Sequence, residues 1–353
     1  MGVTSLYVDK LPERHSGVFP VFRAPAPLVS IPSDLLSIAR RCYLEKDYKQ
    51  AESKLNELLS ENTSNKDAIA LLIRVYSSTS RFSKARDLFE ESRKSGNADK
   101  SVYTAFISSC NRSRTPYETY TLEGYELIDE ARRTGNIMPE AFASLISYYG
   151  RVGAPFLSES LFEKAEGHRD AEVYSSFISA CCGDPWKAER ILDRAQNEGI
   201  LSPQMFKNLV RHYSDSQMTH DARRIFDWAG ARNMLDSELC EMMMRCYLYN
   251  PHEEKATDAR NIFDLALERG LLTHYMCSLM GTGYMDSKMP EKAEEIFRLA
   301  EQFDFADDHL ASVVMRSYAS AGKKNEAKEF LFRSMTLEPA NTNAVGMQSD
   351  VQM

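Results

Sequence analysis

A small residue recurs along this chain at a nearly constant interval, and two bulky apolar side chains follow it three and four positions later. Ala85 begins the segment ARDLF, Ala222 begins ARRIF and Ala293 begins AEEIF. We call the members of this series the small-residue positions: Ala51, Ala85, Gly124, Ser158, Ala188, Ala222, Ala259, Ala293 and Ala327. Five of the eight intervals between them are 34 residues long. A period of this length predicts one supersecondary unit used many times.

A second landmark keeps step with the first. A tyrosine precedes the small-residue position by nine residues in five units, at Tyr76, Tyr149, Tyr213, Tyr284 and Tyr318. Apolar residues at helical spacing lie before each tyrosine, and a second amphipathic stretch follows each small residue. In four units that stretch ends in a glycine 11 residues beyond the small-residue position (Gly96, Gly135, Gly199, Gly270), where a helix C-terminus needs left-handed backbone. Each unit is therefore predicted to be two antiparallel helices that approach closely at the small residue.

The predicted fold is all-α: a right-handed α-solenoid of about nine helical-hairpin repeats over residues 33–341. No stretch shows strand-like alternation long enough to indicate a sheet. Residues 1–32 are rich in proline and are expected to form an extended arm or a weak targeting segment. Residues 342–353 are expected to be a flexible tail.

Charge limits which partners the chain can bind. The formal net charge is −8 and is unevenly distributed: residues 1–100 carry 16 Lys and Arg against 13 Asp and Glu, and residues 101–353 carry 27 against 38. Affinity for nucleic acid comes largely from neutralised phosphates. RNA binding would therefore need a local stripe in which Lys or Arg repeats at the 34-residue period. No apolar run is long enough to cross a bilayer, so no membrane partner is expected.

Catalytic and metal-binding motifs are missing from the sequence. The seven cysteines have no CxxC spacing and most lie among apolar residues, as reduced cysteines packed in a core do. No phosphate-binding glycine loop, GxSxG or HExxH is found. We therefore expect a protein that is not an enzyme and needs no metal or cofactor.

The repeat resembles that of the pentatricopeptide family, with tetratricopeptide-like units at its ends. Residues 135–150 (GNIMPEAFASLISYYG) and 199–213 (GILSPQMFKNLVRHY) are similar to the opening of that family's first helix. A tetratricopeptide unit would place a small residue three positions before the tyrosine, where this chain has Ile73, Ile146 and Val210. Leu337-Glu338-Pro339 nevertheless resembles a tetratricopeptide turn, and a tetratricopeptide adaptor that binds peptide tails remains an alternative.

The resemblance implies that single-stranded RNA is read from the concave surface, at roughly one base per unit. In that family a polar residue six positions before the tyrosine works with a residue at the end of the unit. The corresponding base slots in this chain are Ser37, Ala70, Thr104, Ala143, Ser175, Lys207, Glu241, Ser278 and Ser312. Alanine and glutamate suit this role poorly, so the RNA-binding candidates are Thr104, Ser175, Lys207, Ser278 and Ser312. Ser278 with Asp307 is the one complete pair, and a long base-reading code is not expected.

Two units carry extra residues that could contact a partner. The first insert, 111–120, is basic and aromatic, which makes Arg112 and Arg114 candidates for RNA contact. The second insert spans 249–255. Both inserts, with the concave groove, are also candidate surfaces for other proteins, although extra residues in a solenoid are often plain surface turns.

Two functions remain in competition. One is a non-enzymatic RNA-binding protein of a mitochondrion or plastid, acting in RNA processing, stability or translation. The other is a protein–protein scaffold subunit of a large assembly such as an organellar ribosome, with little or no sequence-specific RNA reading. The organellar location is implied by the resemblance, and a cytoplasmic location is the alternative.

Overall fold

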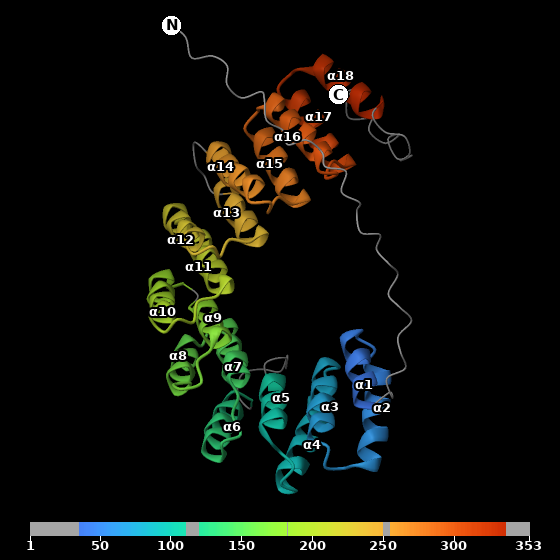
Figure 1. The fold of residues 1–353 in the computed structure, drawn as a ribbon, viewed down its shortest axis with the longest axis vertical. Coiled ribbons are helices and arrows are strands. Elements are labelled where there is room, and N and C mark those ends of the chain that lie inside the picture. Colours follow the sequence, from blue (N-terminus) through green and yellow to red (C-terminus); the bar gives the residue numbers. More distant parts are fainter. Residues whose placement is uncertain (1–34, 111–119, 182, 250–254, 337–353) are drawn as a thin grey trace, which may run out of the picture.

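The computed structural model describes residues 35–110, 120–181, 183–249 and 255–336, and all regular structure in these ranges is helical (Figure 1). Eighteen helices follow one another there as nine antiparallel hairpins. The expected all-α solenoid of nine hairpin repeats is confirmed. The terminal segments 1–34 and 337–353, and most of both predicted inserts, lie outside the described residues.

Each hairpin has a first helix and a second helix. The first helices are α1 (Leu35–Leu44), α3 (Lys66–Ser78), α5 (Lys100–Cys110), α7 (Pro139–Arg151), α9 (Ala171–Ala180), α11 (Pro203–Asp215), α13 (Ser237–Tyr249), α15 (His274–Asp286) and α17 (Asp308–Ser320). The second helices are α2 (Tyr48–Glu61), α4 (Phe82–Lys94), α6 (Tyr120–Thr134), α8 (Pro155–Lys164), α10 (Pro185–Asn197), α12 (Thr219–Ala231), α14 (Lys255–Glu268), α16 (Pro290–Gln302) and α18 (Lys324–Thr336).

Local sequence explains where these helices begin and end. Asp47 caps α2 by accepting a hydrogen bond from the backbone N–H of Gln50 at 3.1 Å, and proline occupies the first turn of α7, α8, α10, α11 and α16. Second helices end in left-handed backbone as the spacing predicts, with φ of 74° at both Gly96 and Gly199. Asn233 and Asp304 fill the same position in two other units, with φ of 58° and 59°. Asparagine and aspartate tolerate this conformation better than most residues.

The two helices of a hairpin lie on opposite sides of the solenoid. Each first helix packs against the first helices before and after it, whereas a second helix packs against its own first helix and the next one. No two successive second helices of the described chain make substantial backbone contact. From α3 to α13 the first helices accordingly line the inner side of an arc and the second helices its outer side (Figure 1). The concave face is therefore built from first helices.

The core of each unit lies where the repeat predicts it. Ala51, Ala85, Ala188, Ala222, Ala259, Ala293 and Ser158 are all fully buried, and Ala327 is 1% exposed. Tyr149 and Tyr213 are also fully buried. Gly281 and Gly283 permit close packing, because a Cβ added to them would lie 2.7 Å from Leu310 Cδ1 and 2.5 Å from Leu248 Cδ2.

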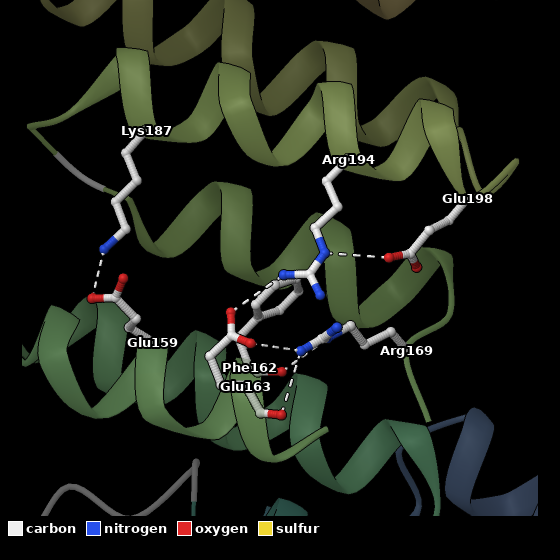
Figure 2. A network of polar contacts seen from close by, with 7 residues as sticks. All are labelled: Glu159, Phe162, Glu163, Arg169, Lys187, Arg194 and Glu198. Atoms are coloured by element: carbon white, nitrogen blue, oxygen red, sulfur yellow. Dashed lines mark hydrogen bonds and ion pairs between the residues drawn. The ribbon is translucent and has the colours of Figure 1, made fainter. Parts of the chain in front are cut away.

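Long charged side chains bridge the gaps between neighbouring second helices. Figure 2 shows such a network between α8 and α10, where Lys187 pairs with Glu159 at 2.8 Å and Arg194 with Glu163 at 3.4 Å. Equivalent pairs join other second helices: Arg93–Glu130, Lys164–Asp129, Arg224–Glu189 and Arg260–Glu295. The outer surface is thus held by cross-repeat ion pairs and the inner side by helix packing.

No helix in the described ranges is long and apolar enough to cross a membrane. The same part of the chain contains no group of three or more His, Cys, Asp or Glu residues that could hold a metal ion.

Candidate nucleic-acid interface

Each first helix of the central repeats leaves only one face open. Helix α11 has α9 and α13 on its two sides and α10 and α12 behind it. Its exposed residues are Pro203 and Gln204 at the start, Asp215 at the end, and Arg211 alone in between. Because the other sides are covered, Arg211 must project from the open face, which is the concave surface of the solenoid.

The position of Arg211 is basic in several units. It lies four residues after the base slot, one helical turn further along the same face. The residues at this position include five exposed arginines, which we call the inner arginine line: Arg41, Arg74, Arg211, Arg245 and Arg316. Successive members are 33 and 34 residues apart where the units adjoin. The stripe that phosphate binding requires is therefore present.

These five arginines have no acidic partner, unlike several arginines of the outer surface. None of the five side chains makes an ion pair or hydrogen bond with any described residue. On the outer surface, by contrast, Arg93, Arg194 and Arg224 each contact one or two carboxylates. The inner arginine line therefore presents positive charge that the protein itself does not neutralise.

The line is interrupted in the middle of the solenoid. Units three, four and five carry Ser108, Ser147 and Ser179 at the same position. The Oγ atom of Ser108 lies 3.0 Å from that of Ser144 on the next first helix. We call the open face of α5, α7 and α9 the serine segment.

Acidic side chains flank the serine segment. Glu140 and Glu172 lie in the first turns of α7 and α9, and Asp170 caps α9 through the backbone N–H groups of Glu172 and Val173. Burial raises the pKa of Glu172, and the negative charges of Asp170 and Glu140 raise it further. These carboxylates therefore lie close enough to repel one another.

Six of the nine predicted base slots are buried rather than open to the groove: Ala70, Thr104, Ala143, Ser175, Lys207 and Ser278. Thr104 is 3% exposed, and Ser175 and Ser278 are each 8% exposed. Their hydroxyl oxygens have no hydrogen-bond partner among the described residues. A base can reach these hydroxyls only if neighbouring first helices move apart. Ser312 is half-buried, and Ser37 is exposed.

The Lys207 slot carries no free positive charge. Its Nζ atom lies 3.1 Å from Asp236 Oδ2 and 2.5 Å from Glu238 Oε2. Burial lowers the pKa of this lysine, but its hydrogen bonds to Glu238 and Asp236 outweigh that effect and raise the pKa overall. Lys207 is thus engaged in ion pairs with two carboxylates, which leave a surplus of negative charge at this slot.

The Asp307 carboxylate is also engaged within the protein. Its Oδ1 atom accepts a hydrogen bond from the backbone N–H of Leu310 at 2.8 Å, capping α17, and its Oδ2 atom lies 2.9 Å from His274 Nε2. Arg112 and Arg114 lie outside the described residues, as do residues 250–254 of the second insert. Their predicted contacts with RNA or protein stay predictions.

A cavity of about 290 Å³ lies at the N-terminal end of the inner arginine line. Its walls come from the first three units: Arg40, Tyr43, Leu44, Asp67, Ala70, Leu71, Arg74 and Ser101. Arg40 and Asp67 pair at 3.4 Å across it, and both side chains are more than half exposed. This end of the groove therefore combines an apolar wall with guanidinium groups.

The sequence analysis asks for Lys or Arg that repeats at the 34-residue period, but it does not identify the five arginines of the inner arginine line. Three consecutive units without arginine hide the period, and unit lengths of 39, 30 and 37 residues shift the register. Counting four positions forward from each base slot would have found all five.

The comparisons with known proteins agree with this architecture. The crystal structure of the pentatricopeptide repeat protein PPR10 from maize is similar to this chain with a TM-score of 0.55 and 16% identity, over 89% of this chain and 45% of the other. PPR10 in complex with an 18-nt psaJ RNA element is similar with a TM-score of 0.50 and 14% identity, over 88% and 55%. This chain thus spans about half the length of those structures.

A tetratricopeptide repeat family model matches residues 43–109, within the first three units. No curated protein matches the sequence. The chain has the α-solenoid fold of helical-hairpin repeats, as the pentatricopeptide repeat structures do. The tetratricopeptide match lies at the N-terminal end, where the sequence predicts units of mixed character.

Proposed function

We propose that this protein binds single-stranded RNA along its concave surface, with phosphates contacting the inner arginine line. The observation that carries the proposal is this line of five exposed arginines without acidic partners, which recurs at the period of the repeat. The likeness of the fold to a protein solved with a bound RNA element supports it. A role in organellar RNA processing, stability or translation, without catalysis, extends the proposal and is supported by the family resemblance alone.

Physical chemistry favours phosphate as the ligand of these side chains. A guanidinium group is always charged and matches the geometry of phosphate oxygens. An arginine without an acidic partner keeps its full positive charge for a ligand such as phosphate. Such a line also offers a way for an acidic protein to bind RNA, because the net charge of −8 is carried mainly elsewhere.

The salt dependence of RNA binding tests the proposal. Each phosphate neutralised on a single strand contributes about −0.7 to the slope of log affinity against log salt, so five arginines predict a slope of about −3.5. The variant Arg211→Gln/Arg245→Gln should weaken binding and reduce the slope by about 1.4. The matched control is Arg194→Gln/Arg224→Gln, which removes two arginines from the outer surface and should leave binding and slope unchanged.

The assay is a titration of labelled random single-stranded RNA with purified protein at several salt concentrations. No binding at about 50 mM salt would refute the proposal. An equal loss in the inner and outer variants would also refute it, since the charge would then act without regard to its place.

A scaffold function is the second candidate, and one observation favours it. Phe156 and Trp186 occupy equivalent positions at the start of α8 and α10 and are 76% and 51% exposed. Large exposed aromatic side chains on neighbouring units are typical of a protein contact. If RNA does not bind, replacing both residues with serine should abolish capture of a partner protein that the unaltered chain retains.

A further inference from the structure

We infer that the concave surface holds RNA phosphates in two separate stretches, and that the serine segment between them holds the strand without ionic contact. This inference rests on the proposed function and goes beyond it. A continuous groove would contact every phosphate in turn. The charges of this groove divide it into three parts.

The division is visible in the position that forms the inner arginine line. Reading along the chain from α1, the residues there are Arg41, Arg74, Ser108, Ser147, Ser179, Arg211, Arg245, Thr282 and Arg316. Two basic units are followed by three serine units, and then by four units of which three are basic. Lys100 and Arg151 are the basic residues of α5, α7 and α9, and they lie at helix ends, away from this position.

The acidic side chains show the complementary pattern. In the flanking units several acids near the first turns have basic partners: Asp67 pairs with Arg40, and Asp236 and Glu238 pair with Lys207. In the serine segment, Glu140 and Glu172 have no basic partner among the described residues. Burial is the main cause of the raised pKa of Glu172, and the neighbouring charges of Asp170 and Glu140 add to it. Phosphates passing over α7 and α9 would therefore be repelled.

Packing in the same three units leaves a surface of small, uncharged groups. A Cβ added to Gly150 on α7 would lie 2.5 Å from Ala180 Cβ on α9, so these helices approach closely. The hydroxyl contact between Ser108 and Ser144 joins α5 to α7. Serine hydroxyls can donate to sugar or base oxygens without neutralising phosphate. The strand can therefore cross the segment by uncharged contacts.

Neutral RNA backbones provide the test. The shortest RNA that binds with full affinity is synthesised with a block of three consecutive methylphosphonates, and the block is moved from one end to the other. A block over either flank should weaken binding about tenfold, because each hydrogen bond to a charged group is lost. A block over the centre should change the affinity by less than about twofold or strengthen it.

Protein variants give a second, independent readout. Glu140→Gln/Glu172→Gln should tighten binding to unmodified RNA several-fold by removing the repulsion, while the control Glu159→Gln/Glu163→Gln on the outer surface should not. Ser147→Arg should tighten binding and steepen the salt slope by about 0.7, because it adds one phosphate contact to the line.

The outcomes separate the two proposals. Strong binding of unmodified RNA with equal losses for central and flanking blocks would overturn the split groove and leave RNA binding in place. Failure of unmodified RNA to bind would remove the proposed function, and the split groove with it. A salt slope that Ser147→Arg leaves unchanged would show that no phosphate passes that point. This result would overturn the inference that the strand crosses the serine segment.

Discussion

The close approach of α7 and α9 at Gly150 predicts how the variant Gly150→Ala should behave. The added Cβ would lie 2.5 Å from Ala180 Cβ and 2.7 Å from Ala180 Cα. Carbon atoms prefer a separation of about 3.5–4.0 Å. Since Ala180 Cα belongs to the backbone, no side-chain rotation relieves the clash. Helices α7 and α9 must instead separate by about 1 Å, against the packing that builds the concave face.

The magnitude follows from two opposing effects. Overpacking of this kind costs about 1–3 kcal/mol. Replacing glycine with alanine in a helix returns up to about 1 kcal/mol. With the full offset, the variant should therefore lose about 0–2 kcal/mol of unfolding free energy.

The chain offers a closely matched control at Gly230. Gly150 is the second-last residue of α7 and Gly230 the second-last residue of α12, so the effect on helix propensity should be similar at both sites. A Cβ on Gly230 would meet Leu235 Cδ1 at 3.4 Å, close to an ordinary contact. Gly230→Ala should thus be neutral or stabilising, and the difference between the two variants isolates the packing between first helices.

Urea unfolding followed by circular dichroism measures that difference. The midpoint of Gly150→Ala should lie below that of Gly230→Ala by on the order of 1 M. Equal midpoints for the two variants would refute the close approach of α7 and α9, and with it the packing argument for the serine segment.

Two further predictions concern titration and thiol chemistry. The hydrogen bond from Arg224 lowers the pKa of Glu189 below its usual 4.5, so this pair should stabilise the fold above about pH 4.5 and lose its effect as the pH falls. Glu189→Gln should accordingly lower the urea midpoint at pH 7, and this deficit should shrink as the pH falls below about 4.5; a deficit that stays constant on acidification would mean that ionisation is not the cause. Burial raises the pKa of the Cys240 and Cys277 thiols to about 11, and all six described cysteines are free and buried. Native protein at about pH 8 should therefore leave these six unmodified by a thiol reagent that labels them all in urea, as mass spectrometry of the labelled peptides would show.

Much of the fold could be predicted from the sequence because its determinants are local and repeated. The small-residue positions, the tyrosines and the left-handed glycines each serve one hairpin, and the structure confirms them. Repetition strengthens the signal further, since a pattern that is weak in one unit recurs in several others.

The candidate site was harder to predict because it depends on contacts between units. The burial of Thr104, Ser175 and Ser278 depends on how closely neighbouring first helices approach, which no single unit specifies. The acids that neutralise Lys207 lie 29 and 31 residues further along the chain. In the sequence Lys207 and Arg211 both look like free cations. In the fold Lys207 is paired with two carboxylates, whereas Arg211 is not.

The unequal construction of the two sides of the solenoid has a mechanical consequence. Side chains on the inner side interlock, while the outer helices are joined through long, partly exposed ion pairs such as Arg194–Glu163, each worth about 1 kcal/mol or less. Bending should therefore leave the inner side nearly constant in length and stretch or compress the outer side, as in a strip that is stiff along one edge. Small changes in outer spacing would then add up over nine units into a large change in curvature. Because surface ion pairs weaken as salt screens them, the solenoid should become more compliant at high ionic strength.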